Sequence, residues 1–160
     1  DFNKAIEINA QDADAYLGRG VLHARTGGHD KALADLDRAI AIDPRYAEAY
    51  AKRCFVKMMI DKPNDALPDC ETAVAVDPRH RDALTNLGVV YAALNRAEEA
   101  AASYRRALAM EPGNGDANYN YGVLLLVQHR LEEARYHLGV GCEARVTAAC
   151  ELLASVRRAP

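Results

Sequence analysis

Apolar side chains in the segment from 81 to 114 recur at the three- and four-residue spacing of amphipathic α-helices. Asn95 and Arg96 interrupt the pattern, and Glu111-Pro112 ends it, because proline lacks an N–H donor and disfavours a helical conformation of the residue before it. The segment therefore predicts two short helices joined by a turn. The two apolar stripes consist of Leu84, Leu87, Gly88 and Tyr91, and of Ala100, Tyr104, Ala107 and Leu108.

The same pattern returns at intervals of 34 residues, as the positions of Asp43-Pro44, Asp77-Pro78 and Glu111-Pro112 show. A fixed period of this length is typical of a repeat array, in which each unit buries its apolar face against its neighbours. The alanines that keep the interval are Ala32, Ala66, Ala100 and Ala134, and then Ala39, Ala73 and Ala107.

The central copy carries the spacing W-x2-L-G-x2-Y…A-x3-F…P of the tetratricopeptide repeat (TPR) family. The matching residues are Leu84, Leu87, Gly88, Tyr91, Ala100, Tyr104 and Pro112. The chain resembles this family over nearly its whole length. The resemblance implies an all-α fold, a right-handed superhelical solenoid of antiparallel helix pairs in which the first helix of each pair lines the concave wall.

The register predicts four repeats between the end of a preceding repeat and a capping helix. When the repeats are aligned, equivalent positions form columns 34 residues apart. In residues 1–12, Phe2 and Ile6 fall in the columns of Leu36 and Ile40. This segment therefore matches the end of a second helix, and we expect its repeat to continue upstream. We expect Phe2 and Ile6 to pack on the following first helix or on a second copy of the chain. The repeats are 13–46, 47–80, 81–114 and a divergent 115–148, and residues 149–160 are expected to form a capping helix.

One polar or glycine column separates the two helices of each repeat, at Gly27, Asp61, Asn95 and His129. These residue types are enriched at positive φ, so the column predicts a left-handed residue that ends each first helix. This explanation of His129 is preferred to a metal pair with His137, because no third ligand has a recognisable spacing. In repeat 47–80, Pro63 suits a first helical turn, but Pro68 removes a backbone donor, so we expect the second helix there to start late or bend.

The four cysteines lack the spacing of a metal or redox motif. Cys54 falls in a column otherwise held by glycine, and Cys70 in a column of large side chains. We interpret both as buried, unpaired thiols, and we leave open whether Cys142 and Cys150 form a bond. Unpaired cysteines favour a reducing compartment, and hence a cytoplasmic location.

The net charge is −3, and no repeat holds more basic than acidic residues, so the composition does not favour nucleic-acid binding. No apolar run approaches the roughly 18 residues of a membrane span, and no signal-peptide pattern is present. Serine is confined to Ser103 and Ser155, and no nucleophile-elbow, phosphate-loop or H-E-x-x-H motif occurs. We therefore expect no enzyme activity, cofactor or metal.

The sequence favours a protein-interaction scaffold or adaptor that binds a peptide or an amphipathic helix. A second stripe on each first helix lies opposite the packed stripe, and the resemblance implies that it lines a concave groove. Acids at the helix starts, Asp14, Glu48, Asp82 and Asp116, would favour a ligand with basic flanks. The candidate binding residues are Lys52, Phe55, Met58, Met59, Asn86, Val89, Tyr119, Asn120, Val123, Leu126 and Val127.

Two binding modes known in the family can be compared with these columns. The carboxylate clamp of TPR co-chaperones is rejected, because acids stand where its cations would be. The asparagine ladder of the O-GlcNAc transferase superhelix is matched by Asn86 and Asn120 and broken by Lys52 and Gly18. Asparagine is also the common residue of that column, so both interpretations stay open. The alternatives to an adaptor are a homo-oligomerising assembly scaffold and the targeting arm of a larger enzyme.

Overall fold

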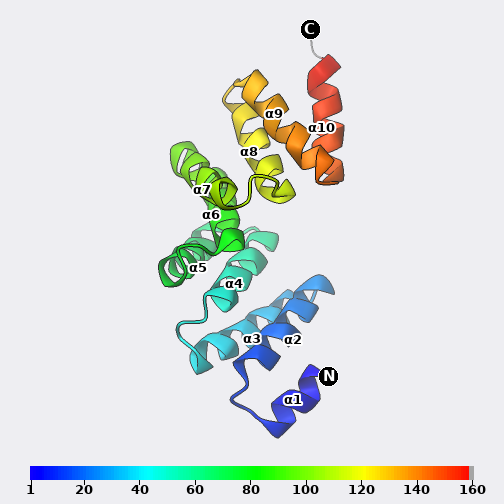
Figure 1. The fold of residues 1–160 in the computed structure, drawn as a ribbon. Coiled ribbons are helices and arrows are strands. Elements are labelled where there is room, and N and C mark those ends of the chain that lie inside the picture. Colours follow the sequence, from blue (N-terminus) through cyan, green and yellow to red (C-terminus); the bar gives the residue numbers. More distant parts are fainter. Residues whose placement is uncertain (159–160) are drawn as a thin grey trace. The chain divides into compact units, whose positions relative to one another are not determined.

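The computed structural model describes residues 1–158, which form ten α-helices and no strand within that range. Consecutive helices pair as hairpins, and the chain is an all-α solenoid of helical repeats (Figure 1). The helices are α1 (Phe2–Ile8), α2 (Ala13–Arg25), α3 (His29–Ile42), α4 (Ala47–Met59), α5 (Pro63–Val76), α6 (Arg81–Ala93), α7 (Ala97–Met110), α8 (Gly115–Val127), α9 (Leu131–Glu143) and α10 (Thr147–Arg158). The helix α10 spans most of the segment 149–160, whose last two positions lie outside the described residues, and its role as a cap of the array stays a prediction.

The chain divides into two compact units, Asp1–Asn86 and the part from Leu87 onward, with the boundary inside α6. In the N-terminal unit, α1 packs on α2, α2 on α3, α3 on α4 and α4 on α5. In the C-terminal unit, α7 packs on α8, α8 on α9 and α9 on α10. Each unit is described by itself below.

The residues between paired helices have the backbone conformation that their column predicted. The φ angles are 79° at Gly27, 55° at Asp61, 58° at Asn95 and 58° at His129. The prediction of a left-handed residue after each first helix is therefore confirmed. Arg145 has a φ of 66° in the turn before α10, a fifth such position that the column did not include.

Close packing between the two helices of a repeat explains the glycine column. A Cβ atom on Gly88 would lie 2.4 Å from a ring carbon of Tyr104, and one on Gly122 would lie 2.9 Å from Leu138 Cγ. Both large side chains are almost fully buried. Glycine is required there because the large residue of the second helix occupies the space of its side chain.

The interpretation of Cys54 and Cys70 as unpaired thiols is wrong. Both are fully buried, as expected, but they form a disulfide between α4 and α5, with their Cα atoms 5.5 Å apart. The two columns contact each other in every repeat, so a cysteine in each places the sulfur atoms together. Cys142 and Cys150 form a second disulfide, between α9 and α10, and no cysteine of the chain is left free.

The second proline of α5 does not delay its helix, so the expectation of a late start is wrong, while the alternative of a bend stays a prediction. α5 starts at Pro63, the column in which the other second helices also begin. Pro68 lies in the second turn and is exposed, while Ala66 and Cys70 beside it are fully buried. Packing of these neighbours holds the helix despite the one lost backbone donor.

The short first helix packs as its register predicted. The ring of Phe2 lies over Gly18 of α2, with a ring carbon 2.3 Å from where a Cβ atom would stand. Ile6 is half-buried, whereas Ile8 is 79% exposed. The Phe2 ring therefore occupies the space beside Gly18, which is half-buried.

Candidate protein-binding surface

The α4 surface, defined by Lys52, Phe55, Met58 and Met59, carries exposed apolar side chains. Phe55 is 47% and Met59 is 48% exposed, while Lys52 and Met58 are half-buried. The opposite face of α4 is buried in the core through Ala49, Cys54 and Val56. Helical periodicity therefore leaves an aromatic ring and a thioether side chain open to solvent on one side of α4.

Lys52 forms ion pairs with acidic neighbours. Its Nζ atom lies 2.9 Å from a carboxylate oxygen of Glu48 and 3.7 Å from one of Asp82, at the start of α6. The cation is thus neutralised within the N-terminal unit. This arrangement agrees with the absence of a clamp for a ligand carboxylate.

Two of the acids at the first-helix starts bind residues that stand just before the next first helix. Tyr46 donates a hydrogen bond to Asp14, and His80 Nε2 lies 2.7 Å from a carboxylate oxygen of Glu48. These two contacts are equivalent, because Tyr46 and His80 are 34 residues apart. The hydrogen bond from His80 lowers the pKa of Glu48 to about 2, and the bond to Glu48 raises the pKa of His80 above its ordinary value.

The Glu48–His80 pair predicts a pH window of greatest stabilisation. The lowered pKa of Glu48 stabilises the fold above its ordinary 4.5, and this contribution is lost as the pH falls toward about 2. The raised pKa of His80 stabilises the fold below its ordinary 6.5, and this contribution is lost as the pH rises through the folded value. We expect His80→Gln to lower the melting temperature most between pH 4.5 and 6.5.

Thermal melts of wild type and His80→Gln across pH measure this difference. The matched control is His129→Asn, which changes an exposed histidine to the residue that Asn95 supplies in the same left-handed column. A melting difference for His80→Gln that does not change with pH would contradict the electrostatic explanation.

The side-chain amides of the two ladder asparagines each donate a hydrogen bond to a backbone carbonyl of the chain itself. Asn86 Nδ2 donates to the Ala51 carbonyl of α4 at 3.3 Å, and Asn120 Nδ2 donates to the Asp116 carbonyl of its own helix at 2.8 Å. Asn86 therefore joins two neighbouring first helices. Its contact with a ligand backbone stays a prediction.

Part of the predicted stripe is buried between neighbouring first helices. Ala51 is fully buried, and it packs with Ala73 and Ala83. Thr85, in the same column, is 8% exposed. Tyr119 continues that column in the C-terminal unit. It is half-buried and packs with the cluster that holds α10 against α9.

The α8 surface is defined by Asn120 and Val123, which are half-buried, and by Val127. Val127 is 73% exposed. Leu126 packs with core clusters on both of its sides, and Val89 packs on the cluster around Tyr104. Since they belong to different units, the α4 and α8 surfaces are two separate candidates.

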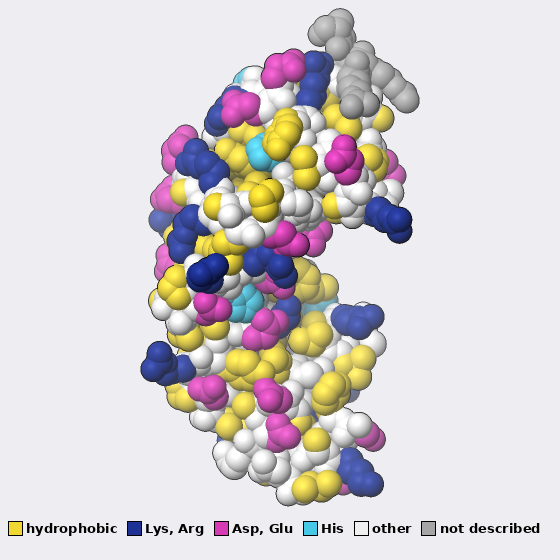
Figure 2. Space-filling model, viewed as in Figure 1, with side chains coloured by type: hydrophobic (Ala, Val, Ile, Leu, Met, Phe, Trp, Pro, Cys, Tyr) yellow, Lys and Arg dark blue, Asp and Glu magenta, His cyan; other side chains and the backbone are white. Residues whose placement is uncertain are grey.

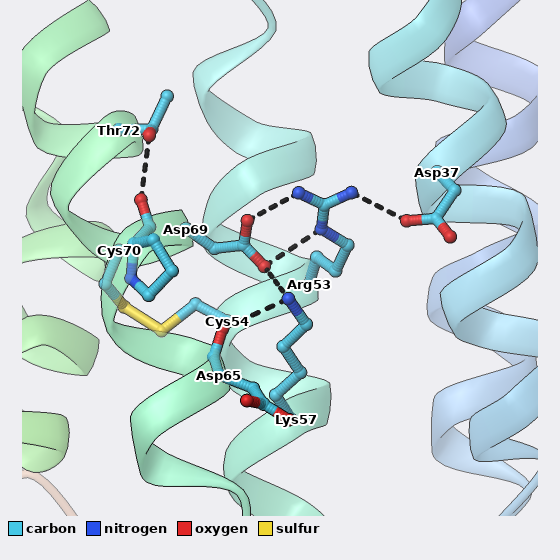
Figure 3. Close-up of polar contacts among 9 residues, drawn as sticks. Asp37, Arg53, Cys54, Lys57, Asp65, Asp69, Cys70 and Thr72 are labelled. Carbon is cyan, nitrogen blue, oxygen red and sulfur yellow. Dashed lines mark hydrogen bonds and ion pairs between the residues drawn. A yellow bond between two sulfur atoms is a disulfide. The ribbon is translucent and has the colours of Figure 1, made fainter.

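An ion cluster between α4 and α5 was not anticipated from the sequence. Asp69, only 4% exposed, accepts two hydrogen bonds from the guanidinium of Arg53, and Lys57 Nζ lies 2.7 Å from one of its oxygens (Figure 3). Arg53 also donates to Asp37 of the preceding repeat at 2.6 Å. Hydrogen bonds to Asp69 raise the pKa of Arg53. The cluster thus ties three helices together.

The first repeat contains an equivalent cluster, and its 34-residue spacing was the signal that could have revealed it. Arg19 donates to both oxygens of Asp35, at 2.9 and 2.7 Å, and to Asn3 of α1 at 2.9 Å. Later repeats lack it, because Leu87 and Tyr121 replace the arginine. Tyr121 instead lies against the ring of His137, at a centroid distance of 4.7 Å.

His137 is occupied by structural contacts. Its Nδ1 atom lies 2.7 Å from the side-chain oxygen of buried Asn118, and burial lowers the pKa of the imidazole.

Among the described residues, no three or more potential metal ligands lie close enough together to hold an ion. Across the same part of the chain, every helix is too short or too polar to cross a bilayer. On the face shown in Figure 2, charges of both signs alternate with hydrophobic side chains.

Hairpins of this length, with glycine-to-large contacts and left-handed turns at a fixed interval, define the class of helical-hairpin repeat proteins. Two tetratricopeptide repeat models match the sequence, one over residues 1–47 and 61–114 and the other over residues 95–139. The chain belongs to the tetratricopeptide repeat family. The search of curated proteins found no match.

Solved structures share this fold. A thermophilic TPR protein of Thermus thermophilus is 24% identical, with a TM-score of 0.84 over 97% of this chain and 86% of that one. MamA is 22% identical, with a TM-score of 0.75 over 92% of this chain and 86% of that one. The first TPR of Spaghetti (RPAP3), bound to the HSP90 peptide SRMEEVD, is 25% identical, with a TM-score of 0.71 over 74% of this chain and 97% of that one.

Proposed function

We propose that this chain is a non-catalytic adaptor whose α4 surface binds an apolar or amphipathic peptide segment. The observation that carries the proposal is the exposure of Phe55 and Met59 beside each other on a first helix whose remaining faces are packed. Exposed aromatic and thioether side chains suit a ligand of variable shape, since methionine adapts to different surfaces. The peptide complex of the RPAP3 repeat supports a peptide as the kind of ligand.

The charges around the α4 surface favour an apolar segment over an acidic one. Lys52 forms ion pairs with Glu48 and Asp82, so the α4 surface has no unpaired cation to bind a ligand carboxylate. Phe55 then provides the largest apolar contact. The α8 surface, through Val123 and Val127, is the equivalent candidate for a second apolar contact in the C-terminal unit.

Peptide selection followed by affinity measurement tests the proposal. Peptides selected from a random displayed library against the whole chain are titrated into wild type, Phe55→Ala and Tyr136→Ala by fluorescence anisotropy. We expect Phe55→Ala to weaken binding by about 2 kcal/mol, as for a central interface anchor. Tyr136 is 67% exposed on α9, a second helix, so Tyr136→Ala should leave the affinity unchanged. Equal affinities for all three proteins would move the site away from the α4 surface.

Self-association is the second candidate function, favoured by the exposure of Phe2 and Ile8 on α1. Light scattering coupled to size-exclusion chromatography tests it, with Ile8→Ser as the variant. A dimer that Ile8→Ser dissociates would support an assembly scaffold.

The expected cytoplasmic location was based on unpaired cysteines. Because all four cysteines form disulfides, that expectation loses its basis.

A further inference from the structure

All four cysteines are used in disulfides that fasten consecutive helices. Cys54 and Cys70 are 16 residues apart and join α4 to α5. Cys142 and Cys150 are 8 residues apart and join α9 to α10. Each unit of the chain therefore contains one bond.

The first bond replaces a packing contact that the other repeats make differently. The same two columns hold Gly20 with Leu36, Gly88 with Tyr104 and Gly122 with Leu138. In repeat 47–80 the small and the large member have both become cysteine. A cysteine against an unchanged large residue would overpack the contact, and a cysteine against glycine would leave it underfilled. The two cysteines fit this position as a pair.

The surroundings of the first bond protect it. Cys54 and Cys70 are both fully buried, and the Arg53–Asp69 cluster lies beside them (Figure 3). Reduction requires a thiolate to reach one of the sulfur atoms. The native fold closes that route, so the bond is structural. Cys142 and Cys150 are half-buried near the end of the described chain, and they are more open to a reductant.

We propose that this protein folds in an oxidising compartment and retains both disulfides as permanent parts of its structure. In forming each bond, two thiols give up two protons and two electrons to the disulfide of a thiol oxidoreductase, which becomes a dithiol. Disulfides persist in oxidising compartments and are rare where glutathione and thioredoxin keep thiols reduced. This inference is independent of the ligand that the α4 surface binds.

Thiol trapping tests the compartment directly. Cells that make the protein naturally are quenched in acid, the chain is alkylated under denaturing conditions with a maleimide–polyethylene glycol reagent, and its mobility is read by immunoblot. We expect no thiol to react until the sample is reduced, after which all four react. Reaction of either pair before reduction would overturn the proposal.

Melting experiments test the structural role of the buried bond. They use a Cys142→Ser, Cys150→Ser background, so that a single disulfide remains. Because the native fold shields the bond, the reduced sample is unfolded, reduced and refolded in reductant before the melt. We expect reduction to lower the melting temperature by roughly 6–12 °C, the shift expected when a loop of this length is no longer closed. The matched variant, Cys54→Gly with Cys70→Leu, restores the pair that Gly20 and Leu36 form in the first repeat.

The restored pair separates the bond from general effects of the reductant. We expect the glycine–leucine variant to melt at the same temperature with and without reductant, and above the reduced parent. A parent whose melt is unchanged by reductant would overturn the structural role, as would a restored variant that is equally sensitive.

Discussion

Asp69→Asn is expected to destabilise the N-terminal unit by about 3 kcal/mol, because it removes the buried carboxylate that Arg53 and Lys57 share. Asp69 is 4% exposed and accepts hydrogen bonds from both Arg53 and Lys57. Asparagine has nearly the same shape but no charge, so the change isolates the electrostatic contribution. Urea unfolding followed by circular dichroism measures the loss.

The neighbouring carboxylate provides the control. Asp37 binds the same guanidinium of Arg53, but its side chain is 61% exposed. Exposed ion pairs contribute about 0.2–1 kcal/mol, so Asp37→Asn should have a small effect. Equal losses for the two variants would mean that burial does not set the strength of this cluster.

Gly88→Leu is expected to destabilise the C-terminal unit by about 3 kcal/mol through overpacking. Even the first atom of the new side chain would lie 2.4 Å from the ring of Tyr104, which is 1% exposed and has little space to move into. The thermal melt measures the effect.

Gly139→Ala is the matched control in the same unit. Gly139 also lies inside a helix, α9, but a Cβ atom there meets nothing within 4 Å. Alanine loses less backbone entropy than glycine on folding, so this change should stabilise the unit by about 0.5–1 kcal/mol. Similar melting temperatures for the two variants would contradict the conclusion that Gly88 is closely packed and Gly139 is not.

The repeat period was sufficient to predict the helices and their turns. Asn95 and His129 both take positive φ where the column predicted it. Such local features follow from residue type and spacing alone, because they depend on the backbone of one turn.

Features that depend on two columns at once were missed. Cys54 and Cys70 were assigned to separate columns, and only the geometry of Gly88 against Tyr104 shows that those columns meet. Arg53 and Asp69 were missed for the same reason, although Arg19 and Asp35 repeat their spacing. A comparison between columns 16 residues apart would have found both pairs.

The binding stripe was predicted only in part, because helical periodicity does not show which side chains a neighbouring helix will cover. Phe55 and Val127 are exposed, but Leu126 packs against core clusters on both sides. Leu126→Glu would therefore disturb folding as well as binding. Val127→Glu is the better test of the α8 surface.

The three methionines allow a direct test of the central claim that the α4 surface is the binding site. Met58 and Met59 lie on that surface, and Met110, 38% exposed at the end of α7, serves as an internal control. The measurement is a titration of a selected peptide into protein labelled with ¹³C at the methionine methyl groups, with each resonance assigned by a Met→Leu variant. We predict that the Met58 and Met59 methyl resonances move and saturate with the peptide while that of Met110 stays in place. Saturable binding that leaves both the Met58 and Met59 resonances unchanged would contradict the account.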